Sequence, residues 1–292
     1  MWSFPDIDPP VELAAGLTIG KNPDWYSDEQ FKETLTNEQY SEIESAPHAL
    51  MYRFESISLE EADTQWKGLG QRTLLDKALE TIQFANMSLW MSKPTTIYYE
   101  RVITFDCSNT PEIKSVVVPL GPLYAHSAYA SELAYNEDLI NGAQLTKAML
   151  TLSPKTALWV AQYSLWTALI QRTWEVRYLT LWTGLEGLFG PDEGQEVTHK
   201  ISQRIALFLH GHSDLAYEHY KRVKKAYGWR SKTVHGMRLD KLTSDDSEKL
   251  LLEAEMYMRD SLMKILQSQE LIEHFSNKGR DEYLDRLAFQ IG

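Results

Sequence analysis

The sequence predicts a mainly α protein, with a helical bundle at residues 151–292 behind an α+β region at residues 1–150. From residue 153 onward, apolar side chains recur at spacings of three and four, which is typical of amphipathic helices. Between residues 96 and 118, two short runs of β-branched and aromatic residues flank a cluster of turn residues, which predicts a hairpin. At 292 residues and 43% hydrophobic, the chain is long enough for two ordinary domains.

Composition excludes several classes of protein. The single cysteine, Cys107, excludes an internal disulfide and a thiolate-rich metal site, and it favours a reducing compartment. The first residues carry acids where a signal peptide carries bases, and no apolar run approaches the roughly 18 to 20 residues of a membrane span. We therefore expect a cytoplasmic protein with no membrane partner.

The α+β region opens with prolines and a polar stretch at 22–45. The spacing of apolar residues then predicts a helix within 59–91. Strand-forming residues at 96–105 and at 113–118 make the two arms of the hairpin. The segment at 125–150 returns to helical character, so the strand content of this region is expected to be modest.

The bundle is predicted to begin at Ser153, which suits the capping position before a helix that starts with Pro154. This first helix is expected to run without interruption to Phe189, where Gly190 and Pro191 stop it. A continuous apolar stripe along it needs partner helices. The stripe consists of Trp174, Tyr178, Leu181, Trp182, Leu185 and Phe189.

Three further amphipathic helices supply those partners. The second spans 197–209 and stops at Gly211, and the third begins at Ser213 and is expected to break at Gly228. The fourth runs to about Phe275. Four such helices with short connections pack most simply as a four-helix bundle. The inward residues of the fourth helix are expected to be Leu251, Ala254, Met258, Leu262 and Ile265. The polar tail at 276–292 has room for one more short helix.

Charge is unevenly distributed. The formal net charge is -12, yet the segment at 197–238 holds nine lysines and arginines against two acids. A basic patch on an acidic body favours one confined anionic site over a long electrostatic track. Lys221, Lys224 and Lys225 are candidates for steering phosphates, and the alternative is an ordinary solvated helix face.

Arg230 and His235 follow these lysines and form the most informative pair in the chain. A guanidinium holds a phosphate through two hydrogen bonds, and an imidazole moves protons near neutral pH. On a regular helix, five residues rotate by about 500°, which leaves the two side chains roughly 140° apart. Three arrangements would unite them: irregular backbone near Gly228 and Gly236, an arginine that wraps round, or a groove shared with a second copy.

The segment at 227–236 resembles the signature of the HEPN superfamily, which has an arginine, a polar residue directly after it, and a histidine a few residues on. The version here, Arg-Ser-Lys-x-x-His-Gly, is most similar to the Apea-like HEPN branch. The segment at 181–189, with Glu186, is similar to the end of that family's first long helix. The segment at 199–206, with Arg204, resembles the second helix of the branch. The likeness covers about residues 155–275.

The resemblance implies a four-helix bundle that forms a homodimer and brings two Arg-x4-His motifs into one cleft. It implies a metal-independent endoribonuclease of antiphage, toxin or RNA-processing systems, with RNA as partner and no cofactor. By position, His235 would be the acid-base group at the ribose 2'-hydroxyl or the leaving 5'-oxygen, and Arg230 would bind the scissile phosphate. Ser231 would orient these groups, and Lys232 would add positive field. Attack by the 2'-hydroxyl requires RNA and leaves a 2',3'-cyclic phosphate.

Each of these residues also has a structural interpretation. His235 can satisfy a helix end. Glu186 lies at the edge of an apolar stripe, where an unpaired carboxylate is costly, so we expect it to pair with Arg230 or Arg204. Tyr227 and Trp229 are suited either to stack on RNA bases or to pack in the core.

Other histidines give a weaker signal. His199, His210, His212 and His219 cluster in the sequence, but no His-Glu-x-x-His and no cysteine pair accompanies them, so we expect no metal site.

Two alternatives to the nuclease remain open at this point. One is a catalytically silent HEPN domain that binds RNA, a nucleotide or a protein, with residues 1–150 engaging a regulatory partner. The other is a toxin silenced by nucleotide transfer, a branch that usually has a tyrosine two residues after the histidine. That position is Met237 here, which counts against this alternative.

Overall fold

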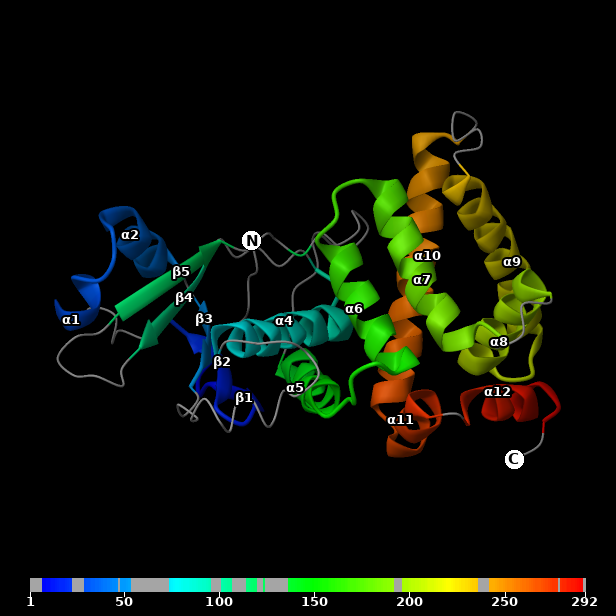
Figure 1. Cartoon of the computed structure of the whole chain (residues 1–292), viewed down its shortest axis with the longest axis horizontal. Helices are drawn as coiled ribbons and strands as arrows, with labels where there is room; N and C mark the ends of the chain where they lie inside the picture. Colours follow the sequence, from blue (N-terminus) through cyan, green and yellow to red (C-terminus); the bar gives the residue numbers. More distant parts are fainter. Residues whose placement is uncertain are drawn as a thin grey trace. The chain divides into compact units, whose positions relative to one another are not determined.

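The computed structural model describes residues 7–22, 29–46, 48–53, 74–95, 101–106, 114–119, 123, 136–191, 196–235, 242–277 and 279–290. These residues form two compact units, which are described separately. The described residues up to 123 and those at 136–150 belong to the first unit, and those from 151 onward belong to the second. The described chain is mainly helical (Figure 1).

The first unit contains a three-stranded antiparallel sheet that the sequence analysis did not predict. Strands β1 (Val11–Ala14), β2 (Leu17–Lys21) and β3 (His48–Tyr52) pair in the order β1-β2-β3. Gly16 makes the turn between β1 and β2 with a φ of 74°, and a Cβ there would lie 2.2 Å from the carbonyl oxygen of Arg53. Only glycine fits this turn. Between β2 and β3 lie α1 (Glu29–Lys32) and α2 (Asn37–Ser45), and Thr36 caps α2.

Two helices complete the core of this unit. Helix α4 (Leu74–Ser92) lies within the predicted helical segment, whose earlier part falls outside the described residues. Helix α5 (Asn136–Leu150) packs on α4 and on β1. Their close approach depends on Gly142, where a Cβ would lie 2.8 Å from the Cδ2 of Leu89. The shared core consists of Ile7, Leu13, Ala14, Leu17, Ile19, Ile82, Ala85, Leu89, Leu139 and Ala143.

The predicted hairpin is confirmed. Strands β4 (Arg101–Asp106) and β5 (Lys114–Pro119) pair antiparallel, with Arg101 opposite Pro119 and Asp106 opposite Lys114. The residues at 96–100, in the first predicted arm, lie outside the described residues, as does residue 113.

The second unit begins with two helices where one was predicted. Helix α6 (Ala157–Leu169) starts after Thr156, whose side chain caps it, and α7 (Trp174–Phe189) starts after Thr173. The prediction of one helix from Ser153 to Phe189 was therefore wrong. A straight helix over 157–189 would extend for about 50 Å. The interruption instead lets α6 and α7 bury their apolar faces against each other.

The end of α7 is as predicted. The helix stops at Phe189, and the N–H of Gly190 donates to the carbonyl of Glu186 at 2.7 Å. A Cβ at Gly190 would lie only 2.4 Å from that same carbonyl oxygen, so the tight turn requires glycine.

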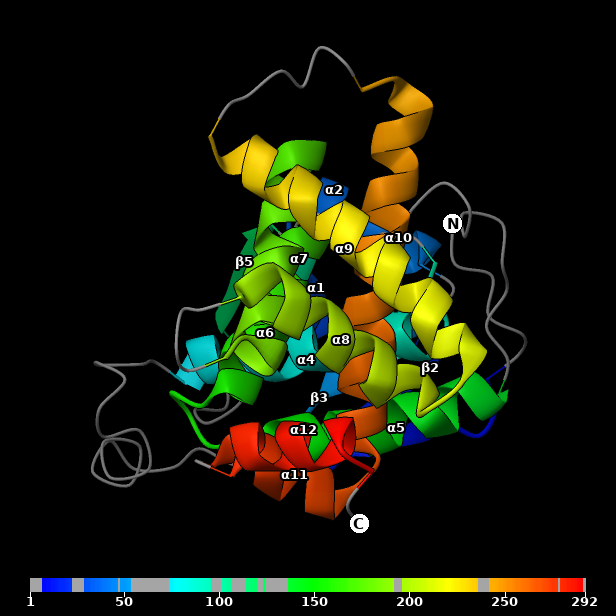
Figure 2. The same cartoon turned by 90° about the vertical axis from the view of Figure 1, so that its right-hand side faces the viewer.

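Helices α8 (Val197–His210), α9 (Asp214–Val234) and α10 (Ser244–Leu266) pack against α7, and α10 also packs against α6 (Figures 1 and 2). The predicted break at Gly228 was wrong, because α9 passes through it. The predicted fourth helix also ends early, at Leu266, and α11 (Gln269–Ser276) follows with Ser268 as its cap. The polar tail forms α12 (Arg280–Ala288), as predicted, and packs on α8. The five residues predicted to point inward from α10 are all buried.

A buried ion pair joins α7 to α10. The Nη2 of Arg177 lies 2.6 Å from the Oε1 of Glu255, and their side chains are 6% and 1% exposed. Burial raises the pKa of Glu255 to about 7, while the charge of Arg177 opposes that shift. Both residues lie on apolar stripes of their helices, which is the signal in the sequence for such a pair. Among the described helices, none is long and apolar enough to cross a membrane.

Candidate functional site

Helix α9 carries both residues of the Arg-x4-His motif. Ser213 caps its beginning by accepting from the N–H of Ala216. Val223 and Ala226 bury its inner face, and the hydroxyl of Tyr178 donates to the carbonyl of Ala226 at 2.6 Å. The helix continues to Val234 and ends with His235 as its C-cap. Because α9 is regular through Gly228, Arg230 and His235 lie on different sides of it, roughly 140° apart.

Arg230 is held by Glu186 of α7. The Nη2 of Arg230 donates to the Oε2 of Glu186 at 2.8 Å, and the hydroxyl of Tyr227 donates to the Oε1 at 2.7 Å. The prediction that Glu186 has a cationic partner is confirmed, and the partner is Arg230. Both side chains of the ion pair are 25% exposed. The Nε of Arg230 is buried and has no hydrogen-bond partner among the described residues, so one donor of the guanidinium is left unused.

Tyr227 belongs to the core and to the support of this ion pair. It is 8% exposed, and its ring meets that of Trp182 edge to face at 5.2 Å. Burial, together with the hydrogen bond to Glu186, raises the pKa of the Tyr227 phenol, so the hydroxyl stays protonated and donates. Tyr227 therefore offers no open ring face to an RNA base, and the core interpretation of this residue holds.

The remaining motif residues are accessible. Ser231, Lys232 and His235 are exposed, and Trp229 is half-buried. The Nζ of Lys232 lies 3.9 Å from the centre of the Trp229 ring, so the ammonium covers one face of the indole. His235 donates its backbone N–H to the carbonyl of Ser231 at 3.4 Å, and its imidazole is directed to solvent at the end of α9.

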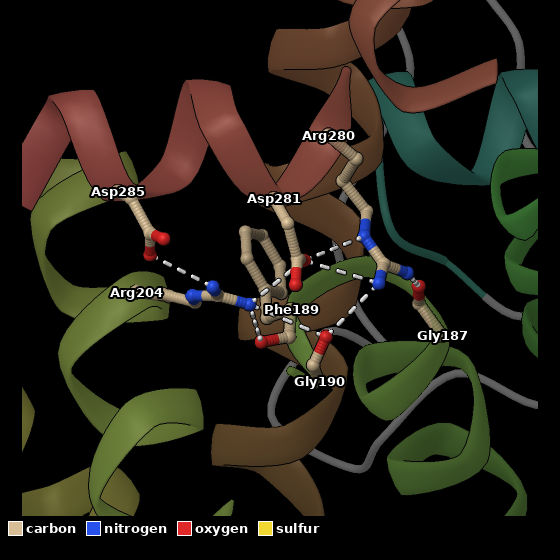
Figure 3. Close-up of polar contacts among 7 residues, drawn as sticks. All are labelled: Gly187, Phe189, Gly190, Arg204, Arg280, Asp281 and Asp285. Carbon is tan, nitrogen blue, oxygen red and sulfur yellow. Dashed lines mark hydrogen bonds and ion pairs between the residues drawn. The ribbon is translucent and has the colours of Figure 1, made fainter. Parts of the chain in front are cut away.

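Arg204 does not pair with Glu186. Its Nη1 lies 3.0 Å from Asp281 and its Nη2 lies 2.9 Å from Asp285, both on α12 (Figure 3). Arg204 also donates to the carbonyls of Phe189 and Gly190 at 3.3 Å. The prediction of Arg204 as an alternative partner of Glu186 was therefore wrong, because Arg204 pairs with two carboxylates of α12 instead.

Arg280 of α12 joins the same cluster. It donates to the carbonyl of Gly187, to that of Gly190 at 3.1 Å, and to Asp281 at 3.2 Å (Figure 3). Cationic side chains at a helix C-terminus satisfy carbonyls that have no partner within the helix. We call Arg204, Arg280, Asp281 and Asp285 the α12 clasp. It fixes the last turn of α7, from which Glu186 projects.

The lysines of α9 all lie in solvent. Lys221 pairs with Glu218 at 2.6 Å, Lys224 donates to the hydroxyl of Tyr220 at 3.3 Å, and Lys225 is exposed. The sequence analysis missed Tyr217 and Tyr220, whose rings accompany these lysines. Each tyrosine precedes its lysine by four residues, and this helical spacing was the available signal.

Of the four histidines that cluster in the sequence, two contact each other and two have other partners. The Nδ1 of His199 lies 2.9 Å from the hydroxyl of Tyr220, and the Nε2 of His212 lies 2.7 Å from the carbonyl of Leu287. The rings of His210 and His219 contact each other at a tilt of 43°, with centres 3.8 Å apart. Among the described residues, no group of three histidine, cysteine or acidic side chains is placed to hold a metal ion.

The arrangement thus provides a half-buried guanidinium that is anchored on one edge and an imidazole that is open to solvent. Comparison of the chain with protein-family models, with curated proteins and with solved structures gives no match.

Proposed function

We propose that this protein is a metal-independent endoribonuclease of the HEPN type, with a role in antiphage defence or in a toxin system. The observation that carries the proposal is the ion pair between Glu186 and Arg230. It joins two segments that resemble HEPN motifs and lie 44 residues apart in the chain, and it leaves His235 accessible at the end of the same helix.

In the proposed reaction, His235 takes the proton of a ribose 2'-hydroxyl or gives one to the leaving 5'-oxygen. Arg230 binds the scissile phosphate and stabilises its developing charge, through the part of its side chain that stays exposed beside Glu186. Glu186 is a positioning residue, because it fixes the guanidinium without touching RNA.

The separation of Arg230 and His235 around α9 supports a site shared by two copies of the chain. With the two side chains roughly 140° apart on one helix, a single copy presents them in different directions. A homodimer through the helical bundle would let each copy complete the other's site, as in the HEPN resemblance.

The test is cleavage of labelled RNA in the presence of EDTA by the wild type, His235→Ala and Arg230→Ala. Cleavage is expected to survive chelation, to leave 2',3'-cyclic phosphate ends, and to vanish in both variants. The controls are His274→Ala and Arg286→Ala, which remove a half-buried histidine and an exposed arginine of the same unit. Activity that is lost on chelation would overturn the metal-independent mechanism.

Replacing Glu186 with glutamine tests its positioning role. The amide keeps a hydrogen bond to Tyr227 but loses the charge that holds Arg230, so we expect kcat to fall about tenfold or more. The KM for RNA and the unfolding temperature should change little, because a half-exposed ion pair contributes only about 1 kcal/mol to stability. An unchanged kcat would remove Glu186 from the site.

A second candidate function is a silent HEPN domain that binds RNA, a nucleotide or a protein. It is favoured by the engagement of Arg230 with Glu186, which competes with any phosphate for the guanidinium. Folded protein that binds RNA but cleaves none would establish this alternative. In either case, residues 1–150 are proposed to engage a regulatory partner.

A further inference from the structure

One face of α9 carries rings, lysines and His235 in a single line. His235 follows Tyr217 by eighteen positions, which is five full turns at 3.6 residues a turn. From Tyr217 to His235, the positions within about 60° of that line are Tyr217, Tyr220, Lys221, Lys224, Gly228, Ser231, Lys232 and His235. We call this face the α9 stripe. It lies opposite the inner face that Ala226 and Thr233 bury, and it extends for about 27 Å.

The rings at the start of the stripe are placed for stacking. Tyr217 is 62% exposed, and its ring lies nearly parallel to that of Tyr220, at 17° with centres 6.3 Å apart. His199 of α8 supports this arrangement, because its ring meets Tyr220 edge to face at 5.6 Å and shares a hydrogen bond with its hydroxyl. Exposed aromatic faces bind unpaired bases of any sequence.

Lysines accompany the rings. The Nζ of Lys221 lies 4.9 Å from the centre of the Tyr217 ring, and that of Lys224 lies 5.6 Å from the centre of the Tyr220 ring. Glu218 pairs with Lys221, but both side chains are about half-exposed or more, so the pair is weak and a phosphate can replace the carboxylate. Between Tyr217 and His235 the stripe contains no acidic residue, and Asp214 lies at the edge of the same face one turn earlier.

Gly228 leaves the backbone bare of any side chain in the middle of the stripe. A glycine inside a helix costs about 1 kcal/mol relative to alanine, so a helix keeps it where something must come close. Among the described residues, nothing lies within 4 Å of the place where a Cβ at Gly228 would stand. Close packing with described parts of this chain therefore does not account for the glycine, and the open space leaves room for a bound molecule to approach the backbone.

We propose that the α9 stripe binds single-stranded RNA and leads it to His235. This inference rests on the proposed function. Alternating rings and lysines match alternating bases and phosphates, and the bare backbone at Gly228 admits a sugar or a base. A second copy of the same stripe is disfavoured as the occupant, because it would set lysines against lysines.

The test measures binding of polyuridylate to the His235→Ala protein, which does not cut it. Tyr217→Ala and Tyr220→Ala should each weaken affinity about fivefold or more, with the salt dependence unchanged. Lys221→Ala and Lys224→Ala should each lower the slope of log affinity against log salt by about 0.7. Phe289→Ala, which removes a ring that is 78% exposed on α12, and Lys249→Ala on α10 are the matched controls.

Gly228→Ala separates binding from folding. It should raise stability, since alanine favours the helix, and yet weaken RNA binding by obstructing the stripe. Equal binding of duplex and single-stranded RNA would overturn the proposal, because paired bases cannot stack on the rings. A second result would also overturn it: Gly228→Ala changes the mass of the assembly in light scattering but leaves the affinity for RNA unchanged. The stripe would then be the surface that binds a second copy of the chain.

The two proposals fail in different ways. If Tyr217→Ala and Tyr220→Ala cut RNA as fast as the wild type, the stripe proposal is overturned and the nuclease proposal stands. If the stripe variants weaken RNA binding as expected but the wild-type protein cuts no RNA, the stripe proposal is supported and the nuclease proposal is overturned.

Discussion

Gly184 and Gly187 are neighbours on α7 with opposite surroundings. A Cβ at Gly184 would lie 2.2 Å from the Cε of Met258 and 2.9 Å from the Cβ of Ser164, whereas at Gly187 the nearest atom is the carbonyl oxygen of Ala157 at 3.8 Å. The methionine tip can move, but Ser164 is fixed close to the backbone of α6. Gly184 is therefore the position at which α6 and α7 touch.

Replacing each glycine with alanine should thus have opposite effects. We expect Gly184→Ala to lower the free energy of unfolding by about 1–3 kcal/mol through overpacking. Gly187→Ala should raise it by up to about 1 kcal/mol, because alanine favours the helix and its Cβ would make only an ordinary van der Waals contact. Urea denaturation measures both. Equal destabilisation by the two variants would contradict this account of the contact.

His210 and His219 should make the stability of the helical unit depend on pH. Burial lowers the pKa of both imidazoles. For His210, the charges of Lys264 and Arg222 lower the pKa further, and that of Asp260 raises it. For His219, His210 and Arg222 lower the pKa further, and Glu253 raises it. The Nε2 of His210 and the Nδ1 of His219 are buried and have no hydrogen-bond partner among the described residues.

The unfolded chain therefore binds more protons than the folded one below the ordinary histidine pKa of about 6.5. Stability should fall as the pH drops from about 6.5 toward the lowered values. His219→Gln should flatten this dependence of the unfolding temperature, and His274→Gln should not. The raised pKa of Glu255, about 7, acts in the opposite sense, because this residue stabilises the fold more as the pH falls below that value. The informative quantity is therefore the difference in unfolding temperature between the variant and the wild type at each pH. A profile that His219→Gln leaves unaltered would contradict the assignment.

At the scale of elements, the α12 clasp determines how firmly the end of α7 is held. Arg280 is only 15% exposed and bonds to the carbonyls of Gly187 and Gly190. Without it, these carbonyls lose a charged donor while they stay largely covered. We expect Arg280→Ala to cost about 1–3 kcal/mol and to speed amide hydrogen exchange in the last turn of α7.

Arg286→Ala is the control for this variant, since Arg286 lies on the same helix but is 57% exposed and 3.6 Å from Glu282. Its effect should stay within about 0.5 kcal/mol. Exchange at the end of α7 that is the same in both variants would show that the clasp does not stabilise that turn.

At the scale of the whole molecule, each unit has a core of its own. The helical unit buries large side chains from α7, α8, α10 and α11, among them Trp182, Phe189, Phe208, Tyr257 and Phe275. Residues 151–292 expressed alone should therefore keep helical circular dichroism and unfold in one cooperative transition. A gradual, non-cooperative transition would show that this unit depends on residues 1–150.

How far the sequence predicts the fold depends on the length of the pattern. The hairpin, α8 and the inward face of α10 follow from repeated local spacings and were predicted. The sheet formed by β1, β2 and β3 was missed, because its strands are only four or five residues long and a single glycine makes one turn. The interruption between α6 and α7 was missed because apolar periodicity continues on both sides of it.

For the candidate site, the sequence by itself determined which ionisable side chains are available. It determined that a carboxylate, an arginine and a histidine lie on amphipathic helices, that Arg230 and His235 are five residues apart, and that their region is basic. It also determined that Glu186 needs a cation, since the cost of burying an unpaired charge does not depend on the fold.

Only the tertiary structure decided which charges meet. Arg230 reaches Glu186 across 44 residues of chain, Arg204 reaches Asp281 across 77, and Tyr227 supports the first pair from the core. Local periodicity gives the face of a helix on which a residue lies. Which charged group lies opposite that residue depends on how α7, α8, α9 and α12 pack, because an ion pair forms only between groups a few ångströms apart.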